Sequence, residues 1–170
     1  MSRAMLRQLR GAQQSRAAAY ITPSRTTWAA VVIASRETDS GVATSVAIKL
    51  QDAFRQLCDG STDDDLFDRL ASAINIGLIR AEKIDPLLET SLLAGRDALV
   101  ECDGIRGRHG RYGFTGPGMA AMRTALDDYE IIVAASTPHL MQAAIDESIR
   151  RMRAGDVVSS QVLQLARAYV

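Results

Sequence analysis

Apolar residues recur at helical spacing along most of the chain, and polar or proline-containing start signals separate the recurring stretches. The pattern between Ser61 and Gly155 predicts four helices. Their start signals, in chain order, are Ser61 or Thr62, Asp85-Pro86, Pro117 and Thr137-Pro138. Their apolar stripes are Leu66, Leu70, Ile74 and Gly77; Leu88, Leu92, Gly95, Leu99 and Cys102; Met119, Met122, Leu126, Tyr129 and Val133; and Met141, Ala144, Ile145, Ser148 and Met152. Such stripes pack against one another, so the sequence predicts an all-α helical bundle at 61–155 within a single domain of residues 1–170.

The second of these helices carries apolar residues on two sides. Leu92 and Leu99 belong to its main stripe, whereas Leu93 and Val100 lie on another face. A helix that is apolar on two faces requires more than one neighbour to cover it. We therefore expect this helix to lie at the centre of the bundle.

The segment 26–48 allows two structures. Thr26–Ala34 is rich in β-branched residues, and the turn-forming residues Glu37–Gly41 suit a hairpin into Val42–Ile48. Alternatively this segment is helical, because apolar residues continue at helical spacing from Val42 to Leu57. We favour helices, and leave the hairpin as the alternative.

The segment Asp103–Gly118 differs from the rest of the chain. It contains six of the twelve glycines, at positions 104, 107, 110, 113, 116 and 118. Between them stand Arg106, Arg108, His109, Arg111, Tyr112 and Phe114. This density of glycine predicts a loop between two helices.

The predicted loop has two interpretations. Its backbone N–H groups and guanidinium groups suit a phosphate backbone, while an aromatic ring would stack on a base. The candidate binding residues are Arg106, Arg108, His109, Arg111 and Tyr112. In the alternative interpretation the loop only connects two helices, with Tyr112 and Phe114 anchored in the core and the arginines solvated or paired with nearby acids.

Both ends of the chain are predicted to add short helices. Residues 1–25 form a basic N-terminal arm, since the first 36 residues contain six arginines and no acid. A helix over 3–20 would place Arg3, Arg7 and Arg10 on one face, suited to a phosphate backbone or to acidic residues elsewhere on the protein. A last short helix is predicted at Ser159–Tyr169.

Charge and hydropathy exclude some classes of partner. Twenty Lys and Arg residues balance twenty Asp and Glu residues, so attraction of the whole surface to nucleic acid or anionic lipid is not expected. The longest apolar run, Trp28–Ala34, is too short to cross a bilayer, so we expect no membrane contact. No secretory pattern is present, and we favour a bacterial cytoplasmic protein over one with an organellar transit peptide.

Familiar catalytic and metal-binding patterns are missing from the sequence. The two histidines lack the His/Cys/Asp spacing of a metal site, and no Gly-x-Ser-x-Gly occurs. Cys58 and Cys102 each precede Asp-Gly, which predicts that both lie in the last turn of a helix. Cys102 with His109 is the one conceivable nucleophile–base pair. We expect no enzyme activity, no metal and no cofactor.

Several stretches together resemble a known kind of protein. They are L-A-S-A-I-N-I-G-L-I-R-A-E (Leu70–Glu82), the glycine-rich segment, A-L-D-D-Y-E (Ala125–Glu130) and R-R-M-R-A-G (Arg150–Gly155). In this layout, over half of its length, the chain resembles small helical accessory proteins of bacterial phage-like and plasmid-like elements. The resemblance implies an accessory or regulatory role, and no particular activity or binding residue.

Two functions of different classes fit these observations. The first is a non-catalytic interaction or regulatory protein that associates with itself or with another protein. Its basis is the apolar segments Trp28–Ile33 and Val157–Leu165, which one small bundle would leave uncovered. The second is a nucleic-acid-binding module that uses the N-terminal arm and the Arg/Gly segment at 104–118.

Overall fold

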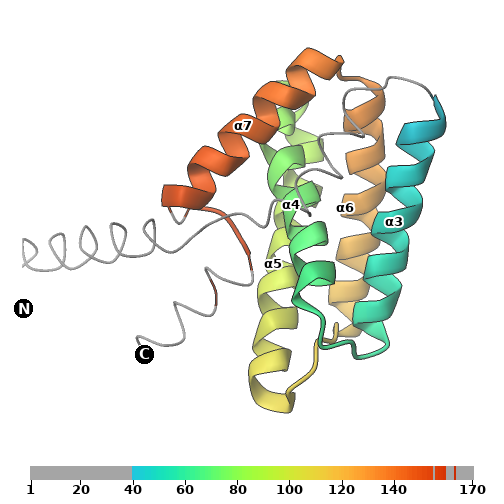
Figure 1. Ribbon diagram of the computed structural model, residues 1–170, viewed down its shortest axis with the longest axis vertical. Coiled ribbons are helices and arrows are strands. Elements are labelled where there is room, and N and C mark those ends of the chain that lie inside the picture. The colour runs from blue at the N-terminus through green and yellow to red at the C-terminus, as the bar shows by residue number, and fades with distance from the viewer. Residues whose placement is uncertain (1–39, 155, 160–162, 164–170) are drawn as a thin grey trace, which may run out of the picture.

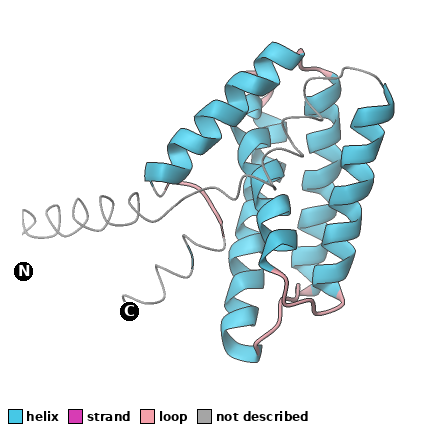
Figure 2. Ribbon diagram, in the orientation of Figure 1, coloured by secondary structure: helices cyan, strands magenta, loops and turns pink. Residues whose placement is uncertain are grey.

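The fold consists of helices throughout the part of the chain that is described. The computed structural model describes residues 40–154, 156–159 and 163, and these ranges contain no strand (Figure 2). The helices are α3 (Ser40–Cys58), α4 (Asp64–Ala81), α5 (Pro86–His109), α6 (Gly116–Ala134) and α7 (Pro138–Ala154). The all-α prediction is therefore confirmed.

The structure also decides part of the choice between helix and hairpin. Residues 42–48 lie inside α3, so the favoured helix is confirmed there and the alternative hairpin strand is wrong. The choice for residues 26–39 lies outside the described residues. So do the helix expected at 3–20 and, apart from Ser159 and Leu163, the helix expected at Ser159–Tyr169.

The helices run up and down in sequence, and α7 crosses the others obliquely (Figure 1). The central helix is α4, which packs against each of the other four. Every residue from Leu70 to Gly77 is buried, although a surface helix buries only one stripe. The expectation that α5 is central is wrong, since its second face keeps Leu93 half-buried and Val100 exposed.

The helix starts follow the sequence signals closely. The Asp85 carboxylate accepts the Leu87 N–H at 2.8 Å, and Pro86 follows it as the first helical residue. The first helix of the predicted four begins slightly later than expected. Asp63, rather than Ser61 or Thr62, caps α4 and accepts the Asp65 N–H at 2.9 Å.

The predicted loop at Asp103–Gly118 is shorter than expected because α5 continues to His109. Gly110 then adopts a left-handed conformation with φ 72°, and its N–H donates to the Arg106 carbonyl at 2.8 Å. Gly104 and Gly107 therefore lie inside α5, where each costs about 1 kcal/mol of helix stability relative to alanine. The burial of Ala98, Leu99 and Cys102 on the same helix offsets this cost. Cys102 is consequently not in a last turn, whereas Cys58 ends α3 as predicted.

The crossing of α5 and α6 depends on a glycine. A Cβ atom placed on Gly95 would lie 2.5 Å from the Cβ of Ala125, closer than two carbon atoms can approach. The two helix backbones approach this closely only because both residues are small. Gly104, farther along α5, has no such neighbour, since its Cβ would meet only the end of the Arg108 side chain at 3.5 Å.

We expect Gly95→Ala to lower the free energy of unfolding by about 1–3 kcal/mol, because the added methyl group overpacks the crossing. The matched control, Gly104→Ala, should raise it by about 0.5–1 kcal/mol, because alanine favours a helix interior. Chemical denaturation measures both values. Equal effects of the two substitutions would contradict the close crossing.

Candidate interaction site

Tyr112, one of the candidate binding residues, is instead an internal anchor. Its ring is 1% exposed and stacks on Phe67 with the centroids 5.0 Å apart. Its hydroxyl donates to Asp64 Oδ1 at 2.7 Å, and its backbone N–H donates to the Ser61 carbonyl at 3.0 Å. A buried ring offers no face to a base, so the expectation that Tyr112 stacks on nucleic acid is wrong.

Arg106 belongs to the same anchor. Its guanidinium group donates to the Tyr112 hydroxyl at 3.0 Å, pairs with Asp64 at 2.5 Å and lies 4.7 Å from the centre of the Tyr112 ring. Burial and then the hydrogen bond to Asp64 raise the pKa of Tyr112 above its usual value. Phe114 packs edge-on against Phe54 with the ring centroids 5.2 Å apart, so both aromatic side chains of the segment are anchored in the core, as the connector interpretation expects.

The remaining candidate residues of this segment are exposed. Arg108 and His109 lie in the last turn of α5, and Arg111 lies over Gly60, with its Cδ 3.2 Å from the position of a Cβ there. Their role in binding phosphate stays a prediction. The other three candidates, Arg3, Arg7 and Arg10, lie outside the described residues.

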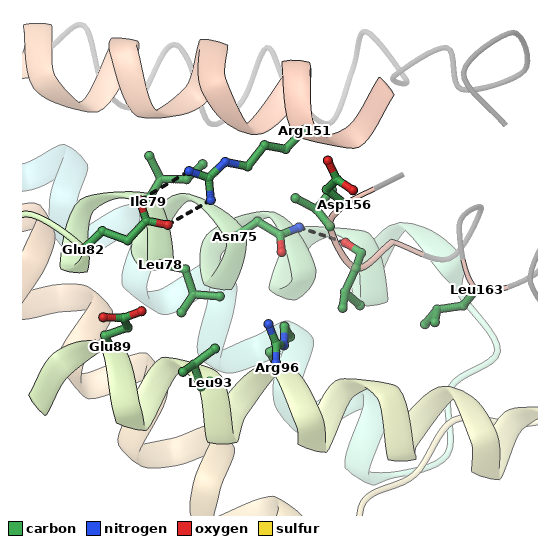
Figure 3. Close-up of a pocket in the computed structure, with 12 residues that line it drawn as sticks. Asn75, Leu78, Ile79, Glu82, Glu89, Leu93, Arg96, Arg151, Asp156 and Leu163 are labelled. Carbon is green, nitrogen blue, oxygen red and sulfur yellow. Dashed lines mark hydrogen bonds and ion pairs between the residues drawn. The ribbon is translucent and has the colours of Figure 1, made fainter. Parts of the chain in front are cut away.

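A groove of about 470 Å³ runs between α4, α5 and α7 (Figure 3). One wall is a face of α4 and consists of Asn75, Leu78, Ile79 and Glu82; the opposite wall is a face of α5 and consists of Glu89, Leu93 and Arg96. Both sets follow helical spacing, so each wall is a single stripe about two turns long. Leu78 and Leu93 point toward one another across the groove (Figure 3).

The third side of the groove is formed by α7 and the chain that follows it. Arg151 donates to Glu82 at 2.9 Å and to Glu147 at 2.8 Å, and so joins α7 to α4. Buried Asn75 donates its side-chain amide to the Val158 carbonyl at 2.8 Å, which holds the segment 156–158 against α4. Val158 is thereby covered, contrary to the expectation that Val157–Leu165 is left uncovered.

Glu147 forms ion pairs with two arginines of α7. Arg151, one turn after it, pairs with Glu147 at 2.8 Å, and Arg150 pairs with the same carboxylate at 2.6 Å. Asp146 accepts from Gln142 at 3.0 Å. Hydrogen bonds from Arg150 and then Arg151 lower the pKa of Glu147 to about 2, so this network stays ionised in neutral solution.

The groove combines apolar walls with charges of both signs along its rim. Glu82, Glu89 and Asp156 supply negative charge, while Arg96 and Arg151 supply positive charge. This arrangement suits an amphipathic helix with charged residues beside an apolar stripe. The sequence did not single out these residues as a site, although the helical spacing of Glu89, Leu93 and Arg96 was a usable signal.

The described residues offer little that is typical of catalysis. Among them, no group of three or more His, Cys, Asp or Glu side chains could hold a metal ion. Burial raises the pKa of Cys102 to about 12 and that of Cys58 above its ordinary value, which disfavours the reactive thiolate. No helix in the described ranges is both long enough and apolar enough to span a bilayer.

Comparisons with known proteins add no identification. No protein-family model, no curated protein and no solved structure matches the chain. The resemblance to accessory proteins of phage-like and plasmid-like elements therefore stays a prediction.

We expect Tyr112→Phe to lower the free energy of unfolding by about 1–3 kcal/mol, because the hydroxyl group joins a carboxylate and a guanidinium group. Tyr129→Phe is the matched control. Burial alone raises the pKa of Tyr129 to about 12, so its hydroxyl group has no comparable charged partners among the described residues and its removal should lower the free energy of unfolding by less. Thermal or urea unfolding of the two variants measures both losses of stability. A Tyr112→Phe protein as stable as the wild type would refute the anchor.

Proposed function

We propose that this protein is a non-catalytic helical interaction protein that associates with a second copy of itself through α5. The observation that supports the proposal is the second face of α5, which carries Glu89, Leu93, Arg96 and Val100 at helical spacing. Val100 is 44% exposed and the Arg96 side chain 41% exposed. We call these four residues the α5 stripe.

The charges of the α5 stripe favour a second copy as the partner. Glu89 lies one turn before Leu93, and Arg96 lies about one turn after it. Two α5 helices related by a twofold axis perpendicular to the helices run antiparallel, and this arrangement pairs Glu89 of each copy with Arg96 of the other. The two Leu93 side chains, which also form part of the groove walls, meet at the centre, and the paired charges lie at the rim.

A single substitution in the stripe tests this function. We expect the wild type to sediment as a dimer, and Leu93→Asp to weaken the dimer at least about tenfold, since it buries a charge at the centre of the interface. The control is Ile48→Asp, because Ile48 is 63% exposed on α3, away from the stripe. A wild type that is strictly monomeric at high concentration, or equal weakening by both variants, would remove the proposal.

Charge reversal in the same stripe checks the geometry of that dimer. Glu89→Arg and Arg96→Glu should each weaken association, because each variant places like charges together. The double variant should recover much of the loss, since it restores opposite charges across the interface. Additive losses would point to a different partner or a different arrangement of the two copies.

A nucleic-acid-binding role is a second candidate function. The observation in its favour is that Arg108, His109 and Arg111 are exposed near one another in the chain, at one end of α5. Arg106 is not part of this set, because it is paired with Asp64. Acids of the same end, such as Asp63, oppose the binding of phosphate.

If this second role holds, affinity for random DNA should fall steeply as salt rises. Replacing both Arg108 and Arg111 with alanine should reduce the slope of log affinity against log salt by about 2, because each arginine bound to a phosphate contributes about 1 to that slope. Arg150→Ala is the matched control, since Arg150 is exposed but paired with Glu147 on α7. Fluorescence anisotropy at several salt concentrations measures the slope, and no binding at low salt would exclude the role.

A further inference from the structure

One end of the bundle exposes an unusual share of apolar side chains. Of the six large apolar residues that are exposed in the described ranges, four lie in the last or first turn of a helix or in the connector beside it: Ile84, Leu87, Ile131 and Leu140. We call these four residues the apolar end. Leu87, in the first turn of α5, is 78% exposed.

The four residues belong to the same end of the molecule. Ile84 and Leu87 flank the start of α5, while Ile131 and Leu140 flank the connector from α6 to α7. Because α4, α5 and α6 run up and down in turn, both connectors lie at one end (Figure 1). A hydrogen bond from Arg80 Nε to Ser136 Oγ, 3.0 Å long, ties the last turn of α4 to the second connector.

The start of α3 also lies at this end (Figure 1). The residues that precede it include the apolar segment Trp28–Ile33, W-A-A-V-V-I, which is separated from Ser40 by six residues. A chain of that length reaches about 20–25 Å when extended. The segment is therefore tethered within reach of the end of the bundle where apolar residues are exposed.

We propose that Trp28–Ile33 packs on the apolar end of its own chain, with Leu87 and Leu140 as its main contacts. Both partners are apolar, so their contact removes from water a surface that the described helices leave exposed. A tether of six residues gives the segment a high effective concentration at this surface, which favours its own chain over a second copy. The apolar end is a different surface from the α5 stripe, so this packing does not depend on the proposed dimer.

Trp28 provides a direct test, because it is the single tryptophan of the chain. In the full chain its emission should be shifted to the blue relative to the urea-unfolded protein, and it should be shielded from acrylamide. The double variant Leu87→Asp/Leu140→Asp should shift the emission to the red and raise the quenching constant about twofold, because it removes the apolar contact. Both positions lie in the first turn of a helix, where aspartate is favoured, so the helices should remain folded.

Two matched controls show whether the effect on Trp28 is specific to the apolar end. Ile48→Asp adds the same charge at another exposed apolar residue and should leave the Trp28 emission unchanged, as should Leu93→Asp in the α5 stripe. The spectrum should also be independent of protein concentration. Wild-type Trp28 quenched as freely as in urea, an equal red shift with Ile48→Asp, or emission that changes on dilution would each overturn the proposal.

Discussion

The burial of α4 on every side is the constraint from which the rest of the structure follows. Its residues from Leu70 to Gly77 contact protein in all directions, so four other helices have to surround it. Polar residues in this helix are then acceptable only with internal partners, and Asn75 and Arg80 find them in the Val158 carbonyl and the Ser136 hydroxyl. The central helix thus also fixes where α7 and the chain after it lie.

The position of α4 leaves α5 with a surface that the bundle does not use. One face of α5 packs against α4 and α6, through Leu92, Gly95 and Leu99. The apolar residues of the neighbouring face, Leu93 and Val100, are half-buried and exposed respectively, and Leu93 lines the groove. Of the two apolar faces of α5, one therefore packs inside the bundle and the other stays partly exposed, and it is this second face that we propose binds a second copy.

The sequence predicts the features of this fold that depend on residues close together in the chain, and it misses those that depend on residues far apart. Helix stripes and the cap at Asp85 are local signals, and they located the helices within a few residues. The identity of the central helix was missed because α4 looks amphipathic, and its polar residues are satisfied only by distant parts of the chain. The glycines at 104 and 107 predicted a loop, yet the anchor made by Tyr112, Arg106 and Asp64 spans 48 residues of sequence, which no local pattern encodes.

The connectors between successive described helices are all short, from three residues between α6 and α7 to six between α5 and α6. Closing such loops costs little chain entropy, and many contacts form between segments that are near in sequence. Topologies of this type cross low kinetic barriers, and helical bundles commonly reach the native state in microseconds to milliseconds. A newly synthesised chain would therefore bury its apolar stripes quickly, before it can aggregate with other unfolded chains.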